Sequence, residues 1–134
     1  MIGLDTNVLA RFIVQDDPVQ SPAATSLLES RCSPDDPGFV SMTVLVELAG
    51  VLSGAYSYER SVVAAVIRQL LQTDSLLTEN APIAWSALRS FEGGSADFAD
   101  YVIGRGNVGA GCHTTYTFDE KAARDRDFDA VPAI

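Results

Sequence analysis

Histidine is almost absent from this chain of 134 residues, which contains only His113. Zinc sites built from several histidines are therefore excluded, and any general base has to be a carboxylate or a metal-bound water. Cysteine is nearly as scarce, because Cys32 and Cys112 are far apart and form no closely spaced metal or redox motif. We expect both to be free, buried thiols, as is usual in a reducing compartment.

Long hydrophobic runs are also missing. No segment reaches the ~18 consecutive apolar residues of a membrane-spanning helix, and no basic segment precedes a short apolar one as in a secretion signal. We therefore expect a cytoplasmic protein without a membrane partner. Because 47% of the residues are hydrophobic and only 20% are charged, the chain is expected to fold around an apolar core.

Basic residues are few: nine Lys and Arg stand against eighteen Asp and Glu, which gives a net charge of −9. Nucleic-acid phosphates are usually bound by Lys and Arg, so simple electrostatic binding of nucleic acid is disfavoured. Clustered carboxylates can still bind a phosphodiester when divalent cations lie between the two. The charge therefore restricts the mechanism without excluding the substrate, and it favours a basic segment in any protein partner.

Hydrophobic patterns alternate between short strands and amphipathic helices. Strands are predicted at residues 1–5, 39–40, 75–78 and 114–118. Helices are predicted after a cap at Thr6 or Asn7, at 21–31, from 43 to 54, and at 58–71, 81–91, 97–105 and 119–126. The alternation predicts an α/β fold with a parallel sheet. Since no linker or repeat is evident, a single domain over residues 1–134 is expected.

Acidic residues stand at the ends of these strands or at the starts of these helices. Asp5 follows the first strand, Asp119 follows the last one, and Asp97 and Asp100 share a face at a helix start. In open α/β sheets, functional groups gather beyond the carboxyl ends of the strands. Glu47 interrupts the apolar segment VLVELAGVL, where a buried lone carboxylate would be costly.

Each acid also has a purely structural explanation. Asp5 and Asp97 can cap helices, Asp100 or Asp119 can be stabilised by a helix dipole, and Glu47 can lie on a solvated face. Those explanations do not account for so many acids at such positions. Carboxylates brought together repel one another, and Mg²⁺ or Mn²⁺, which take oxygen ligands, relieve that repulsion. We therefore interpret the set as a metal site.

Four segments, IGLDTNVLARFI, TVLVELAGVL, SADFADYVI and YTFDEKAAR, resemble the acidic signatures of PIN-domain ribonucleases. Together they are most similar to VapC-type toxins of type II toxin–antitoxin systems, and the resemblance covers almost the whole chain. It implies a PIN-like α/β/α sandwich, in which helices flank a central, mainly parallel sheet. It also implies an Mg²⁺-dependent endoribonuclease (with Mn²⁺ as a substitute), a homodimer, and inhibition by a cognate antitoxin.

The resemblance assigns roles by position. It implies a catalytic quartet of Asp5, Glu47, Asp100 and Asp119, metal ligation by Asp5, Asp100, Asp119 and Asp97, and supporting polar residues Thr6, Asn7 and Thr117. One or two ions would polarise the scissile phosphate of RNA and activate water for in-line attack. Basic residues near the motifs are Arg11, which we favour for steering RNA, and Lys121 and Arg124.

Two other functions stay open. A binding module could keep the fold and lack turnover. An aspartyl-phosphate phosphatase would use Asp5 as its nucleophile, but Asn7 stands where such enzymes have a second Asp.

The segment GRGNVG, residues 104–109, matches the dinucleotide pattern G-x-G-x-x-G, but it trails a helix instead of following a strand. Its glycines depart from the Ala-rich helix usual in the family, and they predict that the helix after Asp100 ends early. The aromatic residues, Trp85 included, are expected in the core and not as base-stacking platforms.

Overall fold

The computed structural model describes all residues, 1–134, and divides the chain into two compact units, Met1–Ala81 and Pro82–Ile134. Six α-helices and short parallel strands make up the fold, so the expected α/β class is confirmed. The strands form one three-stranded and one two-stranded sheet, one in each unit. Each unit is described by itself below.

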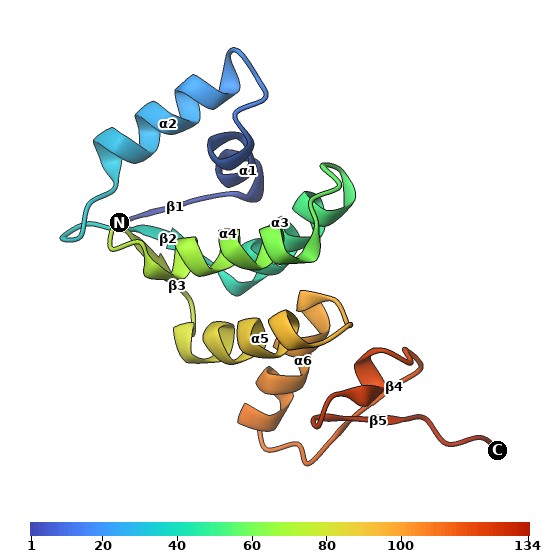
Figure 1. The fold of residues 1–134 in the computed structure, drawn as a ribbon. Coiled ribbons are helices and arrows are strands. Elements are labelled where there is room, and N and C mark those ends of the chain that lie inside the picture. Colours follow the sequence, from blue (N-terminus) through green and yellow to red (C-terminus); the bar gives the residue numbers. More distant parts are fainter. The chain divides into compact units, whose positions relative to one another are not determined.

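The first unit contains three strands and four helices (Figure 1). In chain order they are β1 (Ile2–Gly3), α1 (Thr6–Val14), α2 (Gln20–Arg31), β2 (Gly38–Val40), α3 (Met42–Gly54), α4 (Arg60–Gln72) and β3 (Leu76–Thr78). The sheet order is β1-β2-β3, with every pairing parallel. Helix α1 packs against α2 and α3, and α4 packs against α3 and β3. The fully buried large side chains of this unit are Leu9, Val40, Leu45, Leu48, Leu52, Val63 and Ile67.

The second unit is built from two helices and a small sheet. Its elements are α5 (Ala81–Gly93), α6 (Phe98–Gly109), β4 (Thr115–Thr117), the 3₁₀ turn η1 (Ala122–Arg124) and β5 (Phe128–Ala130). Strands β4 and β5 pair in parallel. The core includes an edge-to-face pair, Phe91 and Phe98, whose ring centroids are 5.9 Å apart.

Four of the five strands lie where the sequence predicts them, but the last part of the chain differs. The helix expected over 119–126 is wrong: only η1 forms there, and β5 follows. Asp125 has an extended backbone and Asp127 comes two residues later. Arg126 and Asp127 then lie in a turn, closed by a hydrogen bond of 3.1 Å from the N–H of Phe128 to the carbonyl oxygen of Asp125. In this turn both carboxylates reach Arg105.

Helix α6 continues to Gly109, so the prediction that it ends early is also wrong. Gly104 explains why a glycine occurs inside this helix. A Cβ atom at Gly104 would lie 2.7 Å from Cε2 of Phe128, so the missing side chain lets that ring pack against the helix backbone. The GRGNVG segment is accordingly the C-terminal half of α6, and not the turn between a strand and a helix that a dinucleotide site requires.

Two glycines of α6 should respond in opposite directions to alanine. Gly104→Ala should lower the free energy of unfolding by roughly 1–3 kcal/mol, because the added methyl group displaces the Phe128 ring. Gly106→Ala is the matched control: nothing lies near its Cβ position, so it should gain up to ~1 kcal/mol from helix propensity. Urea unfolding followed by circular dichroism measures both, and a stabilised Gly104→Ala protein would contradict the packing argument.

Two further expectations are wrong in part. Cys32 is a buried free thiol as expected, whereas Cys112 is free but exposed. The aromatic residues are not all core, because Tyr116 is 62% and Phe118 is 88% exposed. No helix in the chain combines the length and apolar composition needed to cross a bilayer.

Candidate functional site

Asp5, in the first unit, is the N-cap residue of α1. Its backbone is extended, and Oδ1 accepts a hydrogen bond of 2.8 Å from the backbone N–H of Thr6. The prediction that Thr6 or Asn7 caps this helix is therefore wrong. The capping explanation of Asp5 is confirmed, and the carboxylate stays exposed at the end of the β1–α1 connection.

Glu47, on α3, is tied to the start of α1. The hydroxyl of Thr6, which is only 3% exposed, donates a hydrogen bond to Oε1 of Glu47. Glu47 itself is exposed, so the expected burial of its carboxylate is wrong and the solvated-face alternative is correct. The first unit thus brings together one carboxylate of α3 and the Asp5-Thr6-Asn7 segment, with Asn7 also exposed.

The second unit holds the other three acids. Asp97 is the N-cap residue of α6, and its backbone N–H donates to Oδ2 of Asp100 at 3.2 Å, as in a capping box. Asp119 anchors the turn after β4: its N–H donates to the Thr117 hydroxyl at 3.0 Å, and its Oδ1 accepts from the N–H of Ala122 at 2.8 Å. Both Asp97 and Asp119 line one depression of about 320 Å³.

Asp100 shows the effects of burial and of neighbouring negative charge on a carboxylate of this group. Partial burial raises the pKa of Asp100 above its usual value, and the nearby charges of Asp119 and Asp97 raise it further. The hydrogen bond from the Asp97 N–H acts in the opposite direction without cancelling the effect. A cation bound beside these carboxylates would reverse this shift.

The donors in this group suit a hard divalent cation, because all of them are carboxylate oxygens. Neither unit by itself gathers three or more Asp, Glu, His or Cys side chains close enough to hold a metal ion. Mg²⁺ commonly keeps several waters and binds through one or two carboxylates plus substrate phosphates. Asp100 and Asp119 therefore have the donor chemistry of Mg²⁺ ligands.

Arg11 is less available to RNA than the sequence indicates. Its guanidinium forms an ion pair with Asp16 at 3.0 Å and also donates to Gln20 and to the hydroxyl of Tyr56. Lys121 and Arg124, by contrast, line the depression that contains Asp97 and Asp119 and form no salt bridge.

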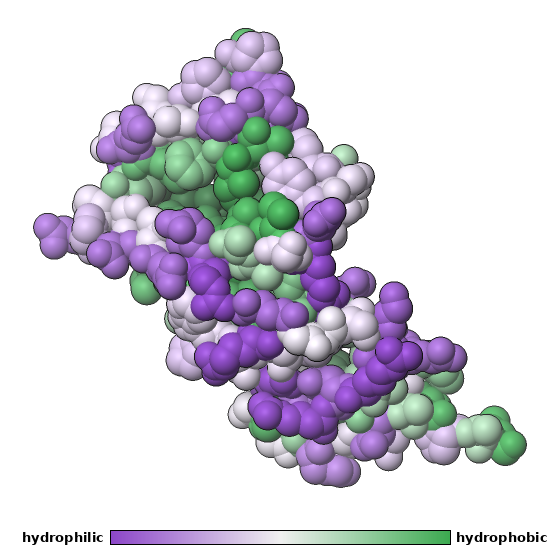
Figure 2. Space-filling view, in the orientation of Figure 1, coloured by the Kyte–Doolittle hydropathy of each residue, from purple (hydrophilic) through white to green (hydrophobic).

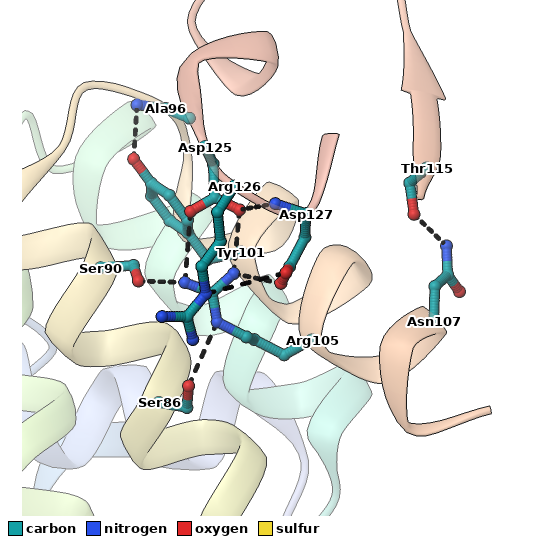
Figure 3. A network of polar contacts seen from close by, with 10 residues as sticks. All are labelled: Ser86, Ser90, Ala96, Tyr101, Arg105, Asn107, Thr115, Asp125, Arg126 and Asp127. Atoms are coloured by element: carbon teal, nitrogen blue, oxygen red, sulfur yellow. Dashed lines mark hydrogen bonds and ion pairs between the residues drawn. The ribbon is translucent and has the colours of Figure 1, made fainter. Parts of the chain in front are cut away.

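A buried ion network in the second unit is the feature that sequence reasoning missed (Figure 3). Arg105 on α6 is 8% exposed and pairs with Asp125 at 2.9 Å and with Asp127. It also donates to the hydroxyls of Ser86, at 3.1 Å, and Ser90 on α5. The network joins α5, α6 and the segment before β5, so it holds in place the segment that follows Asp119.

The network sets the pKa of Asp125. Burial alone would raise that pKa, but hydrogen bonds from Arg105 and from the N–H of Asp127 outweigh it and hold the pKa of Asp125 below its usual value. Arg105 responds in the complementary way: burial pulls its pKa down, while the two carboxylates hold it above the ordinary value.

Stability should therefore fall in acid. Because the pKa of Asp125 is lower in the folded state, its contribution is complete above the unfolded pKa of ~3.9 and is lost as the pH falls through the folded value. Asp125→Asn should flatten the pH dependence below about pH 5. Thermal unfolding across this range measures it, with Asp35→Asn, at an exposed position, as the control. If the unfolding temperature depended on pH equally in wild type and Asp125→Asn, the lowered pKa of Asp125 would be contradicted.

The first unit also has an apolar hollow, visible as green atoms in the upper part of Figure 2. Its volume is about 510 Å³, and its lining includes Phe12, Ile13, Leu28, Val66, Leu70 and Leu76. None of the candidate acids lies in it.

No protein-family model, curated protein or solved structure matches this chain. The assignment of a function therefore depends on the acidic motifs and on the geometry of each unit.

Proposed function

We propose that the protein is an Mg²⁺-dependent endoribonuclease that is also active with Mn²⁺. We further propose that the chain as a whole adopts a PIN-like α/β/α sandwich. The observation that carries the proposal is the grouping of Asp97, Asp100 and Asp119: Asp97 and Asp119 line one depression, and Asp100 is hydrogen-bonded to the N–H of Asp97. Burial raises the pKa of Asp100, and the charges of Asp119 and Asp97 raise it further. These acids occur in motifs that resemble those of PIN-domain ribonucleases, as do Asp5 and Glu47.

In this proposal Asp100 and Asp119 of the second unit are ion ligands, a role that the resemblance also implies for Asp5, and the capping residue Asp97 orients Asp100 and adds negative charge. When bound, the ion polarises the scissile phosphate and promotes attack by water. The resemblance also implies a catalytic role for Glu47, whose carboxylate the Thr6 hydroxyl holds in place. The hydroxyl of Thr117 fixes the backbone at Asp119. No histidine is required, which agrees with the single, exposed His113.

Cleavage of RNA by the purified protein tests the proposal. Incubation of a mixed RNA with Mg²⁺ or Mn²⁺ should give shorter fragments, and excess EDTA should stop the reaction, because carboxylates alone repel the phosphodiester. Gel electrophoresis of the products measures cleavage. RNA that stays intact with both ions would reject the nuclease and favour the binding module.

The binding module is the second candidate, because neither unit alone gathers three metal-ligating side chains. It predicts RNA binding without cleavage in the same assay. The phosphatase has weaker support, since one oxygen of its proposed nucleophile, Asp5, is engaged in capping α1.

The biological role follows from the same resemblance. We propose a cytoplasmic toxin that forms a homodimer and is inhibited by a cognate antitoxin. The net charge of −9 and the apolar hollow favour an antitoxin segment that carries both basic and apolar side chains.

A further inference from the structure

A second depression of the second unit carries an unusual charge for this acidic chain. Its volume is about 540 Å³, and it is lined by residues of α5, of the loop between α5 and α6, and of the segment around η1. Three of the chain's nine basic residues, Arg89, Lys121 and Arg124, line it. A chain with a net charge of −9 thus concentrates a third of its basic side chains in one place.

These cations are available to a ligand. Arg89, Lys121 and Arg124 are all exposed, and none forms a salt bridge. The one side-chain interaction among them is a long hydrogen bond of 3.5 Å from Arg124 to the hydroxyl of Ser95. Exposed arginines elsewhere in the chain, such as Arg126, have a carboxylate nearby.

The single acid of the pocket is already neutralised. Asp125 lines the pocket, but both of its carboxylate oxygens accept hydrogen bonds from the buried Arg105. An incoming anion therefore meets three unpaired cations and one compensated carboxylate. That balance favours an anion with several oxygen acceptors, such as a phosphate group.

Small residues keep the pocket open. Gly93, Gly94 and Ser95 form one side of it, and a Cβ atom at Gly94 would collide with the hydroxyl of Tyr101. The Tyr101 hydroxyl is fixed from the other direction, because it accepts a hydrogen bond of 3.2 Å from the N–H of Ala96 (Figure 3). The loop thus approaches α6 closely and leaves space where side chains would otherwise stand.

The pocket adjoins the acidic depression, because Lys121 and Arg124 line both. A strand whose phosphate occupies the pocket would continue past these two residues toward Asp97 and Asp119. This continuity favours a polymer with regularly spaced phosphates over a lone phosphate ion, because only a polymer can extend from one depression into the other.

We propose that the pocket lined by Arg89, Lys121, Arg124 and Gly94 binds a backbone phosphate of the RNA strand beside the scissile bond. This inference rests on the proposed nuclease function and adds to it the surface that holds the substrate. It also explains how an acidic protein retains RNA: the bound phosphate is neutralised by local cations and not by the net charge.

Binding of RNA in EDTA, where no cleavage occurs, tests the pocket directly. The probe is a short fluorescein-labelled RNA, and fluorescence anisotropy gives Kd at several salt concentrations. Arg89→Gln should weaken binding about tenfold or more, as expected for one charge-assisted contact, and should reduce the salt slope by roughly 0.7. Arg31→Gln, which removes an exposed arginine of α2 outside the pocket, is the matched control and should bind as wild type.

The outcomes separate this inference from the proposed function. Equal Kd values for wild type and Arg89→Gln would overturn the pocket, even if Mg²⁺-dependent cleavage is observed. Binding that depends on Arg89, followed by no cleavage when Mg²⁺ is added, would support the pocket and reject the nuclease. Inorganic phosphate and a 5′-mononucleotide are tested as alternative ligands. Their Arg89-dependent binding without any RNA binding would overturn the assignment to an RNA strand.

Discussion

Arg105→Ala should lower the free energy of unfolding by about 3–5 kcal/mol, the scale of breaking a buried ion pair by removing one partner. The guanidinium is the common partner of Asp125 and Asp127, and it also binds two serine hydroxyls of α5. Without it, two largely buried carboxylates lose their counter-charge. Since small domains are stable by only ~5–15 kcal/mol, such a loss would leave the second unit marginal.

Arg126→Ala is the control for this change. Arg126 is the neighbouring arginine, its side chain is 75% exposed, and its nitrogen lies 3.8 Å from Asp127. A pair with so exposed a cation and so long a separation contributes at most ~1 kcal/mol. Chemical unfolding of both variants at neutral pH gives the comparison. If Arg105→Ala costs no more than Arg126→Ala, the network does not hold the second unit together.

The α/β class could be predicted because it depends on local patterns. Apolar residues at helical spacing identify α3 and α4, and short apolar segments identify β2 and β3, irrespective of what packs on them. The strands are only two or three residues long, yet each lies inside a predicted segment, apart from β5 and the first residue of β2.

The end of the chain could not be predicted in the same way, because its conformation depends on residues far away in sequence. The segment around Asp125 and Asp127 has the composition of a solvated turn, and only Arg105, some twenty positions earlier, makes it a buried one. Gly104 is a similar case. In an isolated helix a glycine is destabilising. At position 104 it is favoured only because the Phe128 ring packs where a side chain would stand.

The candidate acids were found from sequence, but their local roles were only partly anticipated. Asp5 and Asp97 do occupy N-cap positions, as their structural explanation requires. Capping does not exclude metal binding, because a carboxylate has two oxygens and about four acceptor positions. Arg89 lies on α5, whereas Lys121 and Arg124 lie at η1, and only the side-chain placement shows that the three share a pocket.

Asp5→Asn and Asp100→Asn should each reduce RNA cleavage at least about a hundredfold, the scale of losing one electrostatic stabilising group in a catalytic site. Asparagine is the informative replacement because it keeps the hydrogen bonds of the fold. It caps a helix as well as aspartate does, so Asp5→Asn retains the bond from the Thr6 N–H. At position 100 the amide oxygen can still accept from the N–H of Asp97.

The Asp100→Asn change should lower activity but should not lower stability. The pKa of Asp100 is raised in the folded protein, so its charge opposes folding at neutral pH, and Asp100→Asn should unfold at the same or a higher temperature than wild type. Asp74→Asn, an exposed position outside the acidic motifs, removes the same charge and should retain full cleavage. Asp5→Asn protein with wild-type rates would refute the assignment of the acids. A melting temperature that rises with Mg²⁺ in wild type, but less in Asp100→Asn, would tie the carboxylate to the ion independently of turnover, since a ligand of the native state stabilises it.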